Sequence, residues 1–203
     1  RDRAWAYADC GRVKGEWWYH HASYGSNLRM TEWQGAILTA QLERFPDQNE
    51  RRNASAVALG DALADIDGLR PQRRDPRMDS QGNYCYVFHY DSDAFAGMPL
   101  RVFERALAAE GIPMGVSYPS LNELDVFRRR SFGPRLRASA PTIDYTSVQL
   151  PNSERAARST VWLEHRILLA EREDVLDVAR AAARIQQHAS AIVDAVHDPS
   201  EEQ

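Results

Sequence analysis

The sequence contains little lysine, little cysteine and no long apolar run. Lys14 is the single lysine among 25 lysine and arginine residues, so chemistry that needs a lysine amine rests on one position. Cys10 and Cys85 show no CxxC spacing, which argues against a disulfide framework and favours the reducing environment of the cytoplasm. No apolar stretch approaches the roughly 18 residues of a membrane span, and no secretory segment is recognisable, so no membrane association is expected.

The sequence also lacks a strong excess of charge of either sign. There are 25 basic and 29 acidic residues, a net charge of −4, and this balance argues against a nucleic-acid-binding surface. The six histidines show no metal-ligand spacing, so no metal site is predicted. With 203 residues, 43% of them hydrophobic, the chain is long enough and apolar enough to bury a core.

The first strong periodicity lies in residues 30–45, where apolar positions recur every three or four residues. This pattern predicts an amphipathic helix, with Thr31 or Asn27 suited to cap its start. Pro46 should end or break it, and a second helical stretch is expected over 47–66. We expect the two stretches to form one long, kinked helical element.

The remainder of the chain predicts an α/β fold. Residues 70–83 are polar and read as an exposed loop, and the aromatic run 84–90 reads as a strand. Pro99 and Gly111 bracket a predicted helix. Together with the strand before it and a second extended piece at 114–118, this helix would form a βαβ-like unit.

The last third of the chain predicts two more helices. A helix is expected over 153–160, followed at 161–169 by a segment that is either strand-like or a turn into a buried strand. A final amphipathic helix from Val175 to Val196 precedes a polar tail. Residues 127–149 predict no clear element.

Two features near the N-terminus allow more than one interpretation. Lys14 would form a Schiff base if buried, but its glycine-flanked, polar surroundings favour an exposed loop. Gly25, Ser26 and Asn27 precede a helix, where an amide side chain and free N–H groups favour an anion. A plain helix cap is the simpler interpretation of these three residues.

Residues 25–45 read GSNLRMTEWQGAILTAQLERF. This segment resembles the Gly-x-Asn-x-Arg-Met-Ser/Thr-Glu-x-Gln-x-Ala-x-x-x-x-Gln-Leu signature of the DegT and StrS type sugar aminotransferases, pyridoxal-phosphate enzymes of fold type I. Further segments follow in the family's order: ERRN at 50–53, YCYVFHY at 84–90, LAAEGIP at 107–113, SYPSLN at 117–122 and VWLEHRILL at 161–169.

The resemblance implies roles for residues near the signature. In the family, the signature asparagine reaches from one subunit to the cofactor phosphate of its dimer mate, which implies that Asn27 binds pyridoxal phosphate. Arg29 would brace the loop or approach the substrate at the dimer interface. The aromatic residues Trp18 and Tyr19 would line the partner's substrate cleft or, on a second interpretation, pack the dimer interface.

The Tyr-Pro-x-Leu stretch implies a second group of substrate-binding residues. In the family this stretch lies near the substrate, which makes Tyr118 and Asn122 candidates. The family often has histidine at the position of Asn122.

One family feature is absent from the sequence. Family members carry their aldimine-forming lysine in a Ser-x-x-Lys-x-x-Thr-x-Gly-Glu-Gly-Gly context upstream of the signature, and no such segment occurs in this chain. No catalytic residue is therefore assigned, and the chain is expected to be the C-terminal part of such an enzyme. Residues 1–45 would be the end of the large domain with the dimer-interface loop and helix, 46–70 the connecting helix and 71–203 the small α/β domain.

The resemblance implies a homodimeric enzyme with shared active sites. It would transfer an amino group from glutamine or glutamate to a keto-sugar or keto-cyclitol in aminosugar, aminocyclitol or antibiotic biosynthesis, with pyridoxal phosphate as cofactor. Two alternatives stay open: a sugar dehydratase of the same family, in which histidine replaces the lysine, and a non-catalytic ligand-binding or dimerisation relative.

Overall fold

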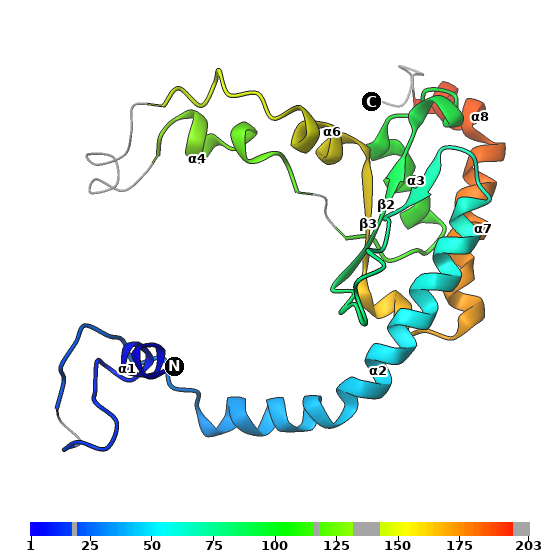
Figure 1. The fold of residues 1–203 in the computed structure, drawn as a ribbon. Coiled ribbons are helices and arrows are strands. Elements are labelled where there is room, and N and C mark those ends of the chain that lie inside the picture. Colours follow the sequence, from blue (N-terminus) through cyan, green and yellow to red (C-terminus); the bar gives the residue numbers. More distant parts are fainter. Residues whose placement is uncertain (18–19, 116–117, 132–142, 197–203) are drawn as a thin grey trace. The chain divides into compact units, whose positions relative to one another are not determined.

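The computed structural model describes residues 1–17, 20–115, 118–131 and 143–196. The chain divides into two compact units, Arg1–Asp47 and Gln48–Gln203. Helix α2, Glu32–Ala64, runs through Pro46 without interruption and so contributes to both units (Figure 1). The prediction that two helical stretches form one element is therefore confirmed, but the expectation that Pro46 ends or breaks the helix is wrong. The assignment of 1–45, 46–70 and 71–203 to parts of a larger enzyme stays a prediction.

The first unit contains helix α1, Asp2–Ala8, a loop and the first half of α2. The loop folds back on itself through two isolated antiparallel bridges, which pair Asp9 with Asn27 and Arg12 with His21. In the described part of this unit no apolar side chain is buried. Backbone pairing and polar contacts, rather than a core, hold the loop together.

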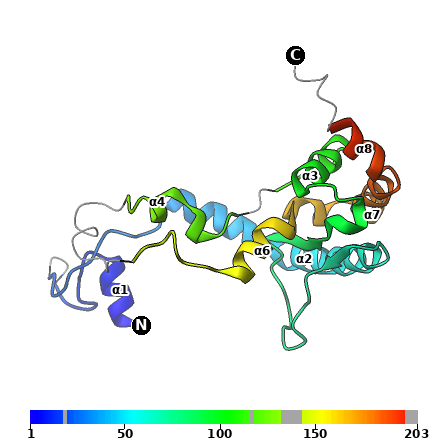
Figure 2. The same cartoon turned by 90° about the horizontal axis from the view of Figure 1, so that it is seen from above.

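The second unit is built on a three-stranded sheet of order β1-β2-β3. Strand β2, Cys85–Tyr90, pairs antiparallel with β1, Leu69–Pro71, on one side and with β3, Thr160–Glu164, on the other. The predicted strand over 84–90 is thus confirmed. The loop predicted over 70–83 is confirmed from Gln72 onward and extends away from the sheet (Figure 2), but Arg70 and Pro71 belong to β1, a strand that was not predicted.

The predicted βαβ-like unit contains an intervening strand. Met114 makes a single antiparallel bridge to Leu163 of β3, and β3 pairs antiparallel with β2, so the chain at Met114 runs parallel to β2 with β3 between them. Strand β3 lies next to β2, and its sequence, TVWLE, is rich in residues that favour strands, whereas Gly115 weakens the shorter segment beside Met114.

Helices α3, Leu100–Ala109, and α7, Arg172–Gln187, pack together in this unit. The predicted final helix is confirmed up to Gln187, but His188 interrupts it, and α8, Ala189–Val196, is a separate helix. The polar tail predicted after it lies outside the described residues. The shorter elements are η1 Ser92–Phe95, η2 Leu121–Glu123, α4 Asp125–Arg128, α6 Pro151–Ser159 and η3 His165–Leu169.

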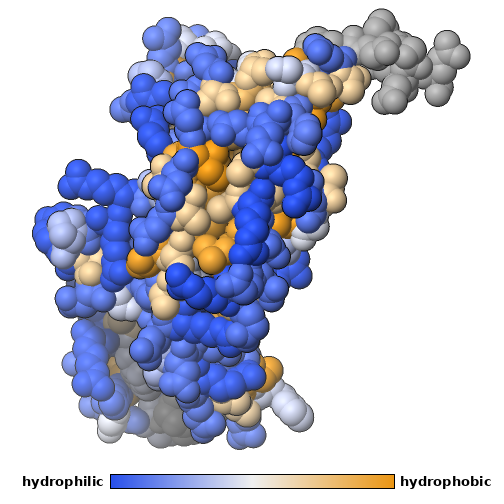
Figure 3. Space-filling model, turned by 90° about the vertical axis from the view of Figure 1, so that its right-hand side faces the viewer, coloured by the Kyte–Doolittle hydropathy of each residue, from blue (hydrophilic) through white to orange (hydrophobic). Residues whose placement is uncertain are grey.

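The core of the second unit follows from the alternation of side chains along the strands. Phe88 of β2 lies opposite Val161 of β3, Tyr86 lies opposite Leu163, and all four side chains are buried. They pack with buried residues from α2, α3 and α7 in one hydrophobic cluster. Viewed from the side on which α7 and α8 lie, charged and polar residues surround the smaller apolar areas of the surface (Figure 3).

Candidate functional site

Asp9 is the centre of the polar contacts in the N-terminal loop. Its side chain is only 13% exposed and forms ion pairs with Arg29 and, at 3.2 Å, with Arg12. Asp9 also pairs through its backbone with Asn27. A buried carboxylate requires such partners, and the contact with Arg29 links positions 20 residues apart in the sequence. This is the contact expected of an arginine that braces the loop; a substrate role for Arg29 stays a prediction.

Gly25 of the signature allows two backbone segments to approach closely. A Cβ atom at this position would overlap the backbone nitrogen of Gly11 and the carbonyl oxygens of Ala6 and Tyr7. Gly11 has a φ of +77°, and a Cβ there would overlap the carbonyl of Ser23. The loop that carries Asn27 therefore depends on two glycines that no other residue replaces without movement of the backbone.

The side chain of Asn27 is exposed and partly held. Its Oδ1 accepts a hydrogen bond from the backbone N–H of Arg29 at 3.4 Å. Its Nδ2 has no partner among the described residues, which leaves two N–H donors available on a side chain whose backbone is fixed by the bridge to Asp9. Such donors suit an anionic acceptor.

The start of α2 is closed by its own residues. The backbone N–H of Thr31 donates to Oε1 of Gln34 at 2.9 Å, and the N–H of Gln34 donates to Oγ1 of Thr31 at 3.3 Å. This reciprocal pair is a capping box, so Thr31 is the cap of the helix. One of the two expectations for the cap is thus confirmed. The expectation that Asn27 caps this helix is wrong, because Asn27 lies outside the capped turn and bonds to Arg29 instead.

The structure describes some of the other predicted site residues and not others. Lys14 is exposed in a turn, as the exposed-loop interpretation expected. Trp18 and Tyr19 lie outside the described residues. Asn27 and Arg29 are brought together in one loop, and Tyr118 and Asn122 belong to the second unit.

Tyr118 lies against the sheet of the second unit. The N–H of Gly115 donates to the carbonyl of Trp162 at 2.8 Å, which continues the bridge made by Met114. The ring of Tyr118 meets the ring of Trp162 edge to face, with centroids 4.9 Å apart. Tyr118 nevertheless stays 65% exposed, so its hydroxyl is available to a ligand.

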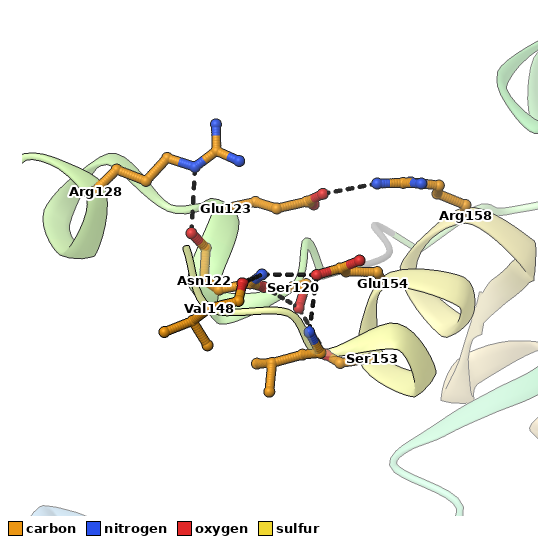
Figure 4. A network of polar contacts seen from close by, with 9 residues as sticks. Ser120, Asn122, Glu123, Arg128, Val148, Ser153, Glu154 and Arg158 are labelled. Carbon is orange, nitrogen blue, oxygen red and sulfur yellow. Dashed lines mark hydrogen bonds and ion pairs between the residues drawn. The ribbon is translucent and has the colours of Figure 1, made fainter. Parts of the chain in front are cut away.

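Asn122 is buried in a network of polar contacts (Figure 4). Its Nδ2 donates to the carbonyl of Val148 at 2.9 Å and to Oε1 of Glu154 at 2.7 Å. Its Oδ1 accepts from the hydroxyl of Ser120 at 2.5 Å, and that hydroxyl also lies 2.9 Å from Oγ of Ser153. Both amide N–H groups of Asn122 are thus engaged within the protein, and its role as a substrate ligand stays a prediction.

Glu154 connects this network to the start of helix α6. It accepts hydrogen bonds from the backbone N–H of Leu150 at 3.0 Å and from Asn122. These two bonds hold the pKa of the Glu154 carboxyl below its usual range. Arg158, one turn further along α6, pairs with Glu123 at 2.9 Å. The network therefore fastens the segment after Tyr118 to α6.

Sequence reasoning missed several residues that build these sites. Thr31 was expected as a cap, but its partner Gln34 was missed, although the two stand at the spacing that identifies a capping box. No local pattern indicated that Asp9 pairs with Arg29, or that Ser153 and Glu154 surround Asn122, because these contacts span many residues. Among the described residues no cluster of three or more histidine, cysteine, aspartate or glutamate side chains is arranged to hold a metal ion. No helix in the described part of the chain is long and apolar enough to cross a membrane.

Comparison with known proteins identifies the family. The sequence profile of the DegT/DnrJ/EryC1/StrS aminotransferase family matches residues 1–183. The chain belongs to this aminotransferase family. Over 170 residues it is 34% identical to the L-glutamine:2-deoxy-scyllo-inosose aminotransferase of Streptoalloteichus tenebrarius, and 36% identical to the enzyme of the same description from Streptomyces fradiae. Each alignment covers 81% of this chain and 39% of the relative.

The fold agrees with this aminotransferase assignment. The crystal structure of 3-amino-5-hydroxybenzoic acid synthase aligns with 92% of the chain at a TM-score of 0.71 and 26% identity. The alignment covers 47% of that protein. The predicted α/β class, as part of a fold type I aminotransferase, is therefore confirmed, and the chain spans less than half the length of the relatives it matches.

Proposed function

We propose that the chain is the C-terminal part of a pyridoxal-phosphate-dependent aminotransferase that moves the amino group of glutamine to a keto-cyclitol. The observation that carries the proposal is the match of 81% of the chain to two enzymes described as L-glutamine:2-deoxy-scyllo-inosose aminotransferases. The proposal also includes keto-sugars as acceptors and glutamate as the amino donor. The free thiols of Cys10 and Cys85 fit the proposed cytoplasmic location.

Asn27 is proposed to hold the cofactor. Pyridoxal phosphate, when bound, supplies the electron sink for the transfer of an amino group. The unpartnered Nδ2 of Asn27 would donate to the phosphate of the cofactor in the partner subunit, and the ion pair between Arg29 and Asp9 would keep the loop in the required conformation. The exposed amide donor fits an oxyanion acceptor, which supports this role.

Tyr118 is proposed to contact the substrate, with Asn122 acting nearby. The exposed hydroxyl of Tyr118 suits the hydroxyl groups of a cyclitol, and the ring contact with Trp162 limits how the side chain moves. Trp18 and Tyr19 are proposed to line the same cleft of the partner subunit. Asn122 would hold the segment that carries Tyr118.

A homodimer is proposed because the first half of α2 presents apolar side chains to solvent. Trp33 is 82% exposed and Leu42 is 67% exposed, and Ile37, Leu38 and Phe45 of the same half of α2 are exposed as well. Such a set of apolar side chains on one helix gains stability when a partner covers it. Leu42→Glu should shift the dimer to monomer in sedimentation equilibrium. Gln41→Glu adds the same charge at the neighbouring exposed position and serves as the control; equal behaviour of the two variants would contradict the interface.

The role of Asn27 is tested by cofactor retention in the full-length enzyme. Asn27→Ala removes a charge-assisted hydrogen bond worth about 1.5 to 3 kcal/mol, so the dissociation constant for pyridoxal phosphate should rise at least tenfold. Retention is measured by the cofactor's absorbance after dialysis. Ser26→Ala, in the same loop, is the control. An unchanged dissociation constant in the Asn27 variant would remove this residue from the site.

Two observations separate the proposed transferase from its alternatives. A lysine in the family context among the residues encoded before Arg1 supports the transferase, a histidine there supports the dehydratase, and neither supports a binding relative. The full-length enzyme, given glutamine and 2-deoxy-scyllo-inosose, should then form the amino-cyclitol. The exposed position of Lys14 predicts that Lys14→Ala leaves the cofactor absorbance unchanged; its loss would make Lys14 a cofactor ligand.

A further inference from the structure

A cavity of about 370 Å³ lies in the second unit between α2 and the β1–β2 region. The second half of α2 forms one wall, strand β2 and the end of β1 form another, and the loop that joins the two strands closes a third side. Its volume lies in the range of small-molecule sites. Residues from Asn53 to Val87 line it, so it contains none of the residues assigned above to the cofactor or the substrate.

The most unusual group in this cavity is the hydroxyl of Tyr86. The residue is 8% exposed, and its Oη has no hydrogen-bond partner. Tyr90, on the same face of the same strand, shows the ordinary arrangement, because its hydroxyl donates to the carbonyl of Met98 at 2.8 Å. Burial raises the pKa of Tyr86, so the side chain is a neutral phenol that can both donate and accept. Buried polar groups are normally satisfied, and an orphaned one on a cavity wall indicates a missing partner.

Three charged side chains also line the cavity, and two of them, Asp61 and Arg73, are exposed and of opposite sign. Asp61 is close enough to raise the pKa of Tyr86 by its charge, and it forms no ion pair or hydrogen bond with the described residues. Arg73 is likewise without a partner in the described part of the chain. Its neighbour Arg74 differs, since it donates to the carbonyls of Met78 and Asp79 and so holds the loop.

The rest of the lining is partly apolar and partly polar. Val57, Pro71 and Val87 supply apolar surface, and Asn53 and Gln81, which also line the cavity, bond to each other. Gly60 lets the phenol approach α2 closely, because a Cβ atom there would lie 3.3 Å from Oη of Tyr86. The cavity thus combines an exposed carboxylate, an exposed guanidinium, one unsatisfied hydroxyl and one apolar wall.

We propose that this cavity binds a free α-amino acid with an apolar side chain. The ammonium group donates to the carboxylate of Asp61 and to Oη of Tyr86, which supplies the partner that the phenol lacks. The carboxylate pairs with Arg73, and the side chain packs against the valine and proline surface. A ligand with only one of the two charges would leave either Asp61 or Arg73 unpaired.

The proposal is tested on this 203-residue chain by NMR titration with three matched compounds. L-leucine carries both charges, 3-methylbutylamine lacks the carboxylate, and 4-methylpentanoate lacks the ammonium group. Leucine should give saturable shifts at the amides of Gly60 and Val87, and each of the other two compounds should bind at least tenfold more weakly. Equal binding of all three, or no saturable shift with leucine, would overturn the proposal.

Three variants separate a built site from a cavity that holds only water. Tyr86→Phe and Asp61→Asn should each weaken leucine binding at least fivefold, and Gly60→Leu should abolish it by filling the space. Asp65 follows the last residue of α2, and its exposed carboxylate does not line the cavity. Asp65→Asn should therefore leave leucine binding unchanged. Unfolding by urea checks that the variants fold. Leucine binding that survives both Tyr86→Phe and Asp61→Asn would assign the site to other residues and refute the proposal.

Discussion

The two units of the chain are stabilised in different ways. The hydrophobic core begins at Ala58, so it lies entirely in the second unit, where residues such as Leu59, Phe88 and Leu163 are shielded from water. In the described part of the first unit, Asp9 and Gly11 are the buried residues, and neither is apolar. The first unit instead exposes apolar side chains along α2, among them Trp33 and Leu42.

This difference shows how one helix serves two purposes. The second half of α2 buries its apolar side chains against the sheet and α7, which is the usual source of helix stability in a folded domain. The first half has similar periodicity but no cover, so its apolar residues are suited to a partner. The same sequence pattern therefore predicts a core helix in one half and an association surface in the other.

The strongest test of this comparison is a matched pair of leucines in α2. Leu59 is 0% exposed and Leu42 is 67% exposed. Leu59→Ala should lower the free energy of unfolding by about 2–5 kcal/mol, because it removes buried surface and leaves a cavity. In the monomeric chain, at concentrations below those at which it dimerises, Leu42→Ala should change it by less than about 0.5 kcal/mol, as exposed substitutions usually do. Urea unfolding of the chain measures both, and equal effects would contradict the comparison.

Gly25→Ala should give the next largest effect, and it should be confined to the first unit. The added Cβ would overlap the backbone of Gly11, so the loop must shift, at a cost of more than about 1 kcal/mol. Hydrogen exchange at the amides of Ser26 and Leu28, which bond to the carbonyls of Tyr7 and Ala8, should become faster.

Gly35→Ala is the control for this glycine test. Gly35 lies within α2, and a Cβ there would meet nothing within 4 Å. Alanine should stabilise the helix by about 0.5–1 kcal/mol. If the amides of Ser26 and Leu28 exchange at the same rate in both glycine variants, the close approach of the two backbone segments does not determine the stability of the loop.

Thr31→Ala tests the start of α2, which lies in the first unit. The substitution breaks the capping box with Gln34, and a lost cap costs about 1 kcal/mol. The loss should appear as faster hydrogen exchange in the first turn of α2. Thr39→Ala is the control, since Thr39 bonds to the carbonyl of Gly35 within the helix and caps nothing. Similar exchange in the two variants would show that the capping box does not anchor this end.

The local elements were largely predictable from the sequence. The aromatic run that forms β2, the bracketed helix α3 and the helix over 151–159 each follow from short-range patterns. Pairing of the strands was not predictable in this way. Strand β3, which lies far along the chain, stands between β2 and Met114, because strand order depends on which distant segment packs best.

The candidate sites divide in the same manner. Asn27 and Arg29 stand in a contiguous signature, so the resemblance located them, whereas the ion pair of Arg29 with Asp9 needed the folded loop. Asn122 was predicted as a substrate ligand from its neighbours in the sequence. Its burial depends on Val148 and Glu154, which come from a later segment that predicted no interaction.

The smallest expected effect concerns Glu154, which joins α6 to the segment after Tyr118. Hydrogen bonds from Leu150 and Asn122 lower the pKa of its carboxyl in the folded chain. A lowered folded-state pKa stabilises the fold above the ordinary glutamate value of about 4.3, and this contribution is lost as the pH falls through the lowered value. Glu154→Gln removes the titration, so its stability should depend less on pH in this acidic range than that of the unaltered chain. The side-chain amide resonance of Asn122 reports the contact directly: it should shift on acidification in the unaltered chain and stay constant in the variant. An identical acid-induced shift in both would show that a group other than Glu154 controls the network.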